Sequence, residues 1–392
     1  MASHAPDVPA DSHSWVVTGA GLISAAGDTP HELYSALRDG LPLAGDPPPS
    51  GALPIDFEPK RYVDRKGLKD ISRVSQLACA AASQLRAEMN GLPAEEIGVV
   101  FGSAWASLDT VVRFERETHL EGPRFVDPVL FTETVPNVPA GQLSIFFGWA
   151  ALNATVAGDT AAGVEALARA IEFLEESRAR VVVAGGGDEL SPHLLRTLEA
   201  DGKLARPDGQ ATGLLGGEGA CVFTLESRAS AAERGSRILG RIRGTTRRFV
   251  QASSGAPGVA EAAALEELLG DCGLDGREID LIVLSANGEP ERDRTEAAAV
   301  RATFGESGPP VVAPKIVLGE TWAAGGPIGL LVALASMRHE KIPAAPRNIA
   351  RAPGLRGLDF PPAPLARRVR NALVLDCSGT GSVAGLVVSR EE

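Results

Sequence analysis

The chain has 392 residues, of which 44% are hydrophobic and 22% charged, and its net charge is −12. This composition is typical of a folded globular protein, and the acidic balance argues against a nucleic-acid surface, which needs clustered Lys and Arg. No stretch offers the roughly 18 uncharged apolar residues that a membrane span requires.

Residues 1–13 lack the basic start and apolar core of a signal peptide, so we expect a flexible tail and a cytoplasmic protein. The four cysteines, Cys79, Cys221, Cys272 and Cys377, show no metal-type spacing. We therefore expect buried thiols in a reducing compartment and no metal site.

Short β-branched runs that end in glycine alternate with helical patterns, which is typical of the α/β class. Their order occurs twice, so we expect two similar halves, residues 14–235 and 236–392, with continuous apolar strands covered on both faces. Strands are expected at residues 15–18, 97–101, 151–157, 181–184, 220–225, 279–284, 311–313, 372–375 and 385–388. Helices are expected at residues 72–89, 161–176, 259–269, 294–304 and 328–337.

Several segments between these elements have their own character. The proline-rich residues 46–59 are expected to form an exposed excursion. Residues 110–134 carry too many large and charged side chains for a linker, and we expect this segment to contribute to specificity. The run GAGLISAAG after the first strand resembles a dinucleotide loop only superficially, because no acidic residue supports it. The glycines at 216–219 and 379–381 are expected to form tight turns.

Residues 138–167 predict a strand, a turn at Gly158-Asp159 and a helix that begins near Thr160. The positive end of that helix suits a nucleophile or an acyl carbonyl, but a threonine hydroxyl needs a base that takes its proton. None of the six histidines stands beside a strand-end glycine turn, so no such base is expected. The other interpretation is that Asp159 or Thr160 caps the helix.

Three segments, DFEPKRYVDRKGLKDISRVSQLACAAA, LLGGEGACVFTLE and WVVTGAGLISAAG, together resemble β-ketoacyl synthases of the thiolase superfamily over nearly the whole chain. The resemblance implies a thiolase-like fold with layers in the order α-β-α-β-α. In active members a cysteine opens the helix after the central strand, and Thr160 stands there in this chain. Asn287 stands at the histidine of the HGT motif, and Glu320 stands at the second histidine, after a retained Lys315.

At the positions where it departs from active members, the sequence resembles chain-length factors, the inactive sister subunits of type II polyketide synthases. That family typically has D-Q-A-G-G where this chain has residues 159–163, and an A-D-G segment followed by D-R-x-E-A where it has residues 286–288 and 293–297. Thr160 and Glu320 replace the usual glutamine and arginine of that family. The resemblance implies a noncatalytic subunit, with Asp159 and Lys315 as structural residues near the degenerate site.

The resemblance also implies partners. An active ketosynthase would form a heterodimer through residues 137–153, and an acyl carrier protein would bring the growing chain on its phosphopantetheine arm, without another cofactor. A helix before the contact region lines the tunnel for that chain in the family. Its residues here would be Thr110, Arg113, Phe114 and Glu117, whose alternative role is surface or core packing.

Two other functions stay open at this point. One is a stand-alone acyltransferase or hydrolase of acyl thioesters that uses Thr160. The other is decarboxylation of a malonyl carrier protein, which the loss of both histidines disfavours.

Overall fold

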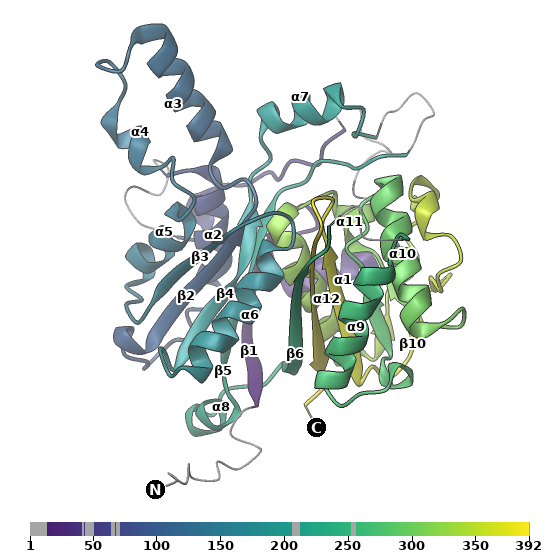
Figure 1. Ribbon diagram of the computed structural model, residues 1–392. Helices are drawn as coiled ribbons and strands as arrows, with labels where there is room; N and C mark the ends of the chain where they lie inside the picture. The colour runs from purple at the N-terminus through teal and green to yellow at the C-terminus, as the bar shows by residue number, and fades with distance from the viewer. Residues whose placement is uncertain are drawn as a thin grey trace, which may run out of the picture.

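The computed structural model describes residues 14–40, 43, 51–63, 67, 71–205, 212–251 and 256–391. The expected tail, residues 1–13, and the start of the proline-rich segment, residues 46–50, lie outside the described residues. Figure 1 shows strands at the centre of the molecule with helices on both sides, and the first and last described residues near its lower edge.

Ten strands form one mixed sheet in the order β3-β2-β4-β5-β1-β6-β12-β11-β7-β8. Read from either edge, the first five strands have the same pattern of parallel and antiparallel neighbours. The two sets meet where β1 pairs with β6 over only three residue pairs. The strands of the first set are β1 (Trp15–Ser24), β2 (Ile97–Ser103), β3 (Asn153–Ala157), β4 (Val181–Asp188) and β5 (Gly219–Ser227). Those of the second are β6 (Gly240–Phe249), β7 (Leu281–Val283), β8 (Val311–Val312), β11 (Asn371–Cys377) and β12 (Ser382–Ser389).

Helices cover the two sets of strands on their outer faces and fill the space between them. The central layer is α6 (Ala162–Glu175) and α12 (Gly325–His339), in which ten of 14 and twelve of 15 residues are buried. Outside the first set lie α2 (Arg73–Ser83) and α5 (Val138–Phe147), and outside the second lie α9 (Val259–Asp271) and α10 (Pro290–Phe304). The layers therefore follow the expected order α-β-α-β-α.

Glycines allow the central layer to pack closely at its upper end. A Cβ on Gly163, in the first turn of α6, would lie 1.9 Å from the carbonyl oxygen of Ala323. A Cβ on Gly325, at the start of α12, would lie 2.1 Å from Cε of Lys315. Because only glycine permits these approaches, the starts of α6 and α12 and the Lys315 segment come together at one place.

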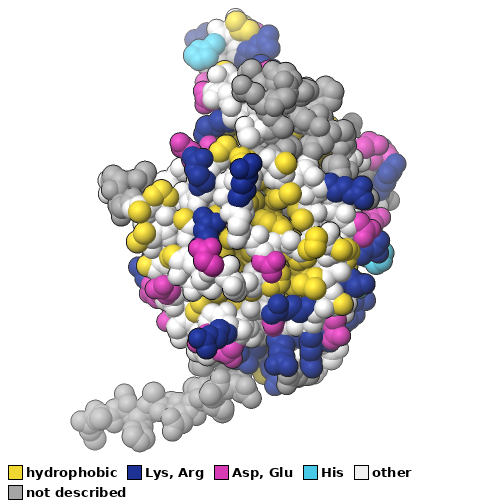
Figure 2. Space-filling view, turned by 90° about the vertical axis from the view of Figure 1, so that its right-hand side faces the viewer, with side chains coloured by type: hydrophobic (Ala, Val, Ile, Leu, Met, Phe, Trp, Pro, Cys, Tyr) yellow, Lys and Arg dark blue, Asp and Glu magenta, His cyan; other side chains and the backbone are white. Residues whose placement is uncertain are grey.

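Most of the remaining helices lie at the margins of this core, whereas the five residues 314–318 are all buried. The remaining helices are α1 (Pro30–Arg38), α3 (Leu108–Glu121), α4 (Pro128–Thr132), α7 (Pro192–Ala200), α8 (Arg228–Arg234) and α11 (Pro314–Leu318), and a second small sheet pairs β9 (Lys341–Ile342) with β10 (Leu365–Ala366). Helices α3 and α4 form an arm that stands away from the body (Figure 1), and α3 has no buried residue. In Figure 2, apolar side chains gather near the middle of one face and Lys and Arg side chains near its lower end.

Several sequence predictions are wrong. Residues 138–147 form a helix, α5, because Pro139 starts it and Gly148 ends it in the left-handed conformation. The strand expected at residues 15–18 is longer, since β1 continues through the GAGLIS run to Ser24. Leu53 in the proline-rich segment is buried against Leu215, so the described part of that segment is not an exposed excursion.

Two further outcomes concern the cysteines and the membrane. All four cysteines are free and buried, which confirms the prediction of buried thiols. Within the described residues, the structure contains no helix that is both long and apolar enough to cross a membrane.

Candidate functional site

The three degenerate positions of the sequence analysis lie around one buried site at the upper end of the central helices. Thr160 precedes α6, Asn287 follows β7 and Glu320 follows α11. The side-chain amide of Asn287 donates to Oε2 of Glu320 at 2.7 Å. Thr160 joins them only indirectly, through a residue that the sequence analysis did not single out, Arg292.

Arg292 lies in the first turn of α10 and links both halves of the chain. Its Nη1 donates to Oε2 of Glu320 at 3.1 Å, and its Nη2 donates to the Thr160 hydroxyl at 3.4 Å. Nη2 also lies 3.6 Å from Oδ1 of Asp376, in β11. Only 6% of the Arg292 side chain is exposed, so the guanidinium occupies the centre of the site and not its surface.

Lys315 supplies the second buried cation. Its Nζ lies 3.0 Å from Oε1 of Glu320 and 3.5 Å from Oδ1 of Asp376. The backbone N–H of Trp322 donates to the same Oε1 of Glu320 at 2.9 Å. We call the six side chains of Thr160, Asn287, Arg292, Lys315, Glu320 and Asp376 the buried network.

The charged groups of the buried network shift each other's pKa values. Burial alone would raise the pKa of Glu320, but Lys315, Arg292 and the Asn287 amide together hold it below its ordinary value. Burial raises the pKa of Asp376 to about 7, although the same two cations act in the opposite direction. Glu320 therefore keeps its charge between two cations, in a nearly dry place where an unpaired charge would be costly, while Asp376 is the carboxyl that gains a proton first as the pH falls.

Further carboxylates hold the loops around the network. Glu296 accepts from the Ser285 backbone N–H at 2.7 Å, and Asp293 accepts from the backbone N–H groups of Asn287 and Gly288 at 3.1 Å each. Burial raises the pKa of Glu296 to about 7 and that of Asp293 to about 6. These contacts fix the turn after β7 and with it the orientation of Asn287.

A buried carboxylate in the first half, Asp188, ties two further loops together. It accepts from the Ser103 hydroxyl at 2.6 Å, from backbone N–H groups of residues 104–106, and from the Ala323 N–H at 3.0 Å. Burial raises its pKa to about 6, against these hydrogen bonds. The loop that leads into α3 is thereby attached to the segment after Glu320.

Thr160 itself is buried beside a fixed turn. Oδ1 of Asp159 accepts from the Ala161 N–H at 2.9 Å, and its Oδ2 accepts from the Thr380 hydroxyl. The α6 helix begins at Ala162, two residues later than the sequence predicted. Asp159 therefore stabilises the turn before the helix, while the Thr160 side chain points to Arg292.

This arrangement lacks the groups of acyl-transfer chemistry. The buried network contains neither a thiol nor an imidazole, and the guanidinium beside Thr160 cannot accept a proton. Cys377 follows Asp376 in β11, but burial raises the pKa of its thiol well above the ordinary value. Among the described residues there is also no cluster of His, Cys, Asp and Glu that could hold a metal ion.

The four expected tunnel residues lie apart from the buried network, on the α3 arm. Thr110 and Phe114 are half-buried, and the Phe114 ring lies 5.9 Å from the Phe131 ring of α4. Arg113 and Glu117 form an ion pair of 2.8 Å at the surface. The structure therefore groups these four with the arm and not with Thr160.

Arg292 and Asp376 are the site residues that the sequence analysis missed. A signal existed for Arg292, since it directly precedes the D-R-x-E-A-like segment at Asp293, but a single arginine at a helix start normally lies in solvent. Asp376 lies between the expected strand at residues 372–375 and the expected glycine turn at residues 379–381, and nothing in that pattern indicates a buried acid.

The sequence matches two family models, "Beta-ketoacyl synthase, N-terminal domain" over residues 62–231 and "Beta-ketoacyl synthase, C-terminal domain" over residues 241–347. It is 30% identical to the granaticin polyketide putative beta-ketoacyl synthase 2 of Streptomyces violaceoruber, over 75% of this chain and 74% of that one. It is 27% identical to the tetracenomycin polyketide synthase ketoacyl synthase beta subunit of Streptomyces glaucescens, over 96% of this chain and 98% of that one.

Solved structures of β-ketoacyl synthases have the same fold as this chain. One described as the ishigamide ketosynthase/chain length factor has a TM-score of 0.87 and 25% identity, over 97% of this chain and 99% of that one. A beta-ketoacyl synthase from Burkholderia phymatum has a TM-score of 0.83 at 22% identity, over 97% of this chain and 100% of that one, which shows the fold alone. The fold that the sequence resemblance implied is confirmed.

Proposed function

Because the chain belongs to the β-ketoacyl synthase family, we propose that it is a noncatalytic member, a chain-length-factor subunit that pairs with an active ketosynthase in a type II polyketide synthase. The observation that carries the proposal is the buried network. Where an active enzyme needs a nucleophile and bases, Thr160, Asn287 and Glu320 are bound to Arg292, directly or through one another.

The buried network also explains how the chain retains the ketosynthase fold without the catalytic residues. A site that had only decayed would leave buried charges without partners, which is strongly destabilising. Here Glu320 has two cations and an amide as partners, and Lys315 remains in place. The former catalytic centre has become a structural junction between the two halves, which we propose meet between α8 and β6, at residues 235 and 236.

The proposed contact with the partner lies at the β3 edge of the sheet. Within the described part of the chain β3 pairs with β2 alone, and its residues are half-exposed or exposed, so its outer edge can accept another strand. The opposite edge strand, β8, has only two residues and both are buried. Large apolar side chains are also exposed on α5, which packs against β3, and on the α3–α4 arm: Ile145 62%, Phe125 74%, Val129 63% and Phe131 59%.

An apolar surface of this extent fits a permanent partner better than solvent. It includes residues 137–153, which the sequence resemblance implies for heterodimer contact. We propose that the α3 arm then reaches the partner, so that Thr110, Arg113, Phe114 and Glu117 face the growing acyl chain. An acyl carrier protein would bring that chain on its phosphopantetheine arm, in the cytoplasm.

Co-expression with a tagged ketosynthase that carries the cysteine and both histidines tests the proposal. We expect the two chains to co-purify in equal amounts, and the product length to depend on this subunit. The proposal fails if the ketosynthase is soluble alone, makes products of the same length without this chain, and never retains it.

The alternative of a stand-alone acyltransferase has a separate test. Purified chain is incubated with acyl thioesters, and its intact mass is measured beside that of Thr160→Ala. We expect no adduct on either protein, because the group that contacts the Thr160 hydroxyl is the Arg292 guanidinium, which cannot accept a proton. An adduct that disappears in Thr160→Ala would establish the alternative.

A further inference from the structure

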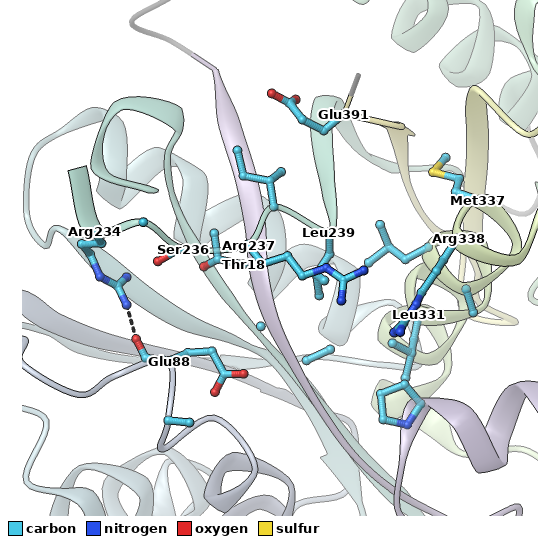
Figure 3. A pocket seen from close by; sticks show the side chains of 18 of the residues that line it. Thr18, Glu88, Arg234, Ser236, Arg237, Leu239, Leu331, Met337, Arg338 and Glu391 are labelled. Carbon is cyan, nitrogen blue, oxygen red and sulfur yellow. Dashed lines mark hydrogen bonds between the residues drawn. The ribbon is translucent and has the colours of Figure 1, made fainter. Parts of the chain in front are cut away.

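A second site of interest is a cavity of about 1040 Å³ at the lower end of the molecule (Figure 3). Its walls come from β1, the turn after α2, the segment between α8 and β6, and the C-terminal half of α12. The buried network lies at the other end of α12, whose 15 residues span about 22 Å at 1.5 Å per residue. The cavity is therefore separate from the degenerate site.

One wall of the cavity is rigid. Arg234 is 12% exposed and pairs at 2.8 Å with Glu226, which is fully buried. Glu226 also accepts from the Thr18 hydroxyl at 2.7 Å and from the Ser230 hydroxyl at 2.8 Å. Arg234 further donates to the backbone carbonyl of Glu88, the contact drawn in Figure 3. This wall is thus fixed by hydrogen bonds and an ion pair within the protein itself.

Two arginines on other walls have no partner of their own. Arg237, in the α8–β6 segment, and Arg338, near the end of α12, are exposed, and the structure gives neither a hydrogen bond nor an ion pair within its described residues. In Figure 3 both guanidinium groups reach into the cavity. By contrast, the lining residues Arg180 and Arg390 pair with Glu233 and Glu340.

Part of the surface next to these arginines is apolar. Ile238, Leu239 and Ala335 line the cavity beside them and are partly exposed, whereas Leu331, Leu334 and Met337 also line it but are almost wholly buried. A pocket of this volume is at the upper end of those that hold small molecules, which also combine an apolar lining with a few polar anchors. A cation pair beside such a lining favours a ligand with an anionic head and an aliphatic body.

Glu88 limits the ligand to one anionic group. Its side chain lies across the cavity from Arg338 in Figure 3, and its Oε2 is buried without a hydrogen-bond partner among the described residues. A second anionic group at that end would meet a like charge, which is unfavourable. A hydroxyl or amide there would instead donate a hydrogen bond to Glu88.

We propose that this cavity binds an aliphatic anion, with its carboxylate or phosphate head between Arg237 and Arg338 and its chain on Ile238, Leu239 and Ala335. The planar guanidinium fork binds either head with two parallel hydrogen bonds. The site does not depend on a partner subunit or on the buried network, so its test is independent of the proposed function.

Calorimetric titration of the full chain with decanoate, decyl phosphate, decanol and inorganic phosphate tests the proposal. We expect decanoate or decyl phosphate to bind, and the tighter of the two identifies the head. Decanol and inorganic phosphate should each bind at least about ten-fold more weakly, since each lacks one of the two contacts. The proposal is overturned if neither amphiphile binds at millimolar concentration, or if decanol binds as tightly as they do.

Variants locate the binding. Arg237→Gln with Arg338→Gln should raise the Kd about ten-fold or more, because charge-assisted hydrogen bonds are lost. Ala335→Phe, which narrows the apolar wall, should also weaken binding. Arg368→Gln, an exposed arginine outside the cavity, is the matched control and should leave the Kd unchanged. Thermal midpoints without ligand verify folding, and an unchanged Kd in the folded double variant would refute the site.

Discussion

The ion pair between Arg292 and Glu320 should stabilise the fold far more than its distance alone suggests. In Arg292→Met the Glu320 carboxylate stays buried and keeps Lys315 at 3.0 Å, the Asn287 amide and the Trp322 N–H as partners. Removing one partner of a buried pair costs about 3–5 kcal/mol. Because Lys315 remains, we expect the free energy of unfolding to fall by an amount near the lower end of that range, about 3 kcal/mol.

A double-mutant cycle isolates the pair from the rest of the network. The free energy of unfolding is measured by urea denaturation for the wild type, Arg292→Met, Glu320→Gln and the double variant. In Glu320→Gln the side chain is neutral, so the further loss of Arg292 leaves less uncompensated buried charge. The free energy of unfolding should therefore fall less in the double variant than the sum of its falls in the two single variants. We expect a coupling energy of about 2 kcal/mol.

The exposed pair Arg113–Glu117 provides the matched control. Its contact, at 2.8 Å, is shorter than that of the buried pair, but the Arg113 side chain is 62% exposed. Exposed pairs four residues apart on a helix contribute about 0.3–0.5 kcal/mol. If the buried cycle gave a coupling no larger than the control cycle, the assignment of Arg292 as the structural centre of the site would be refuted.

Three further predictions concern pH, packing and assembly. Burial raises the pKa of Asp376 from 3.8 to about 7. Between those values the folded chain holds a proton that the unfolded chain has lost, so stability falls as pH rises, by up to about 1.4 kcal/mol per pH unit. In Asp376→Asn this contribution should vanish between pH 5 and pH 7 in urea denaturation, and equal slopes for both proteins would contradict it. Gly163→Ala should cost about 1–3 kcal/mol through overpacking against Ala323. Gly141→Ala, where a Cβ meets nothing within 4 Å, should not destabilise the chain, and thermal midpoints compare the two. Phe131→Asp should weaken retention by the ketosynthase about ten-fold or more, since a charge would be buried at the contact. Phe249→Asp, equally apolar and 73% exposed but at the end of β6, serves as its control, and equal retention of both would count against the β3 surface.

The fold was predictable where local pattern and burial agree. Strand β4 is a continuous apolar run that is buried throughout, so its position followed from composition. Strand β6, with the sequence GRIRGTTRRF, was not predicted, because its buried and exposed residues follow no apolar run. The glycines of β1 looked like a loop, although Gly21 is needed because a Cβ there would lie 2.0 Å from the Ala81 carbonyl oxygen.

The site was predictable in part. Thr160, Asn287 and Glu320 were found by resemblance, and the structure brings Asn287 and Glu320 into contact. The role of Arg292 could not be derived, because it depends on the packing of α10 against the start of α6 in the other half of the chain. Short-range sequence patterns carry no information on such a contact across 132 positions.

The central helices have a consequence for how the chain folds. Helices α6 and α12 belong to different halves, yet each buries most of its surface, partly against the other. A half made alone would expose that apolar face to water, and the three residue pairs between β1 and β6 could not replace it. We therefore expect the two halves to unfold in one cooperative transition, and separately expressed halves to aggregate unless they are made together.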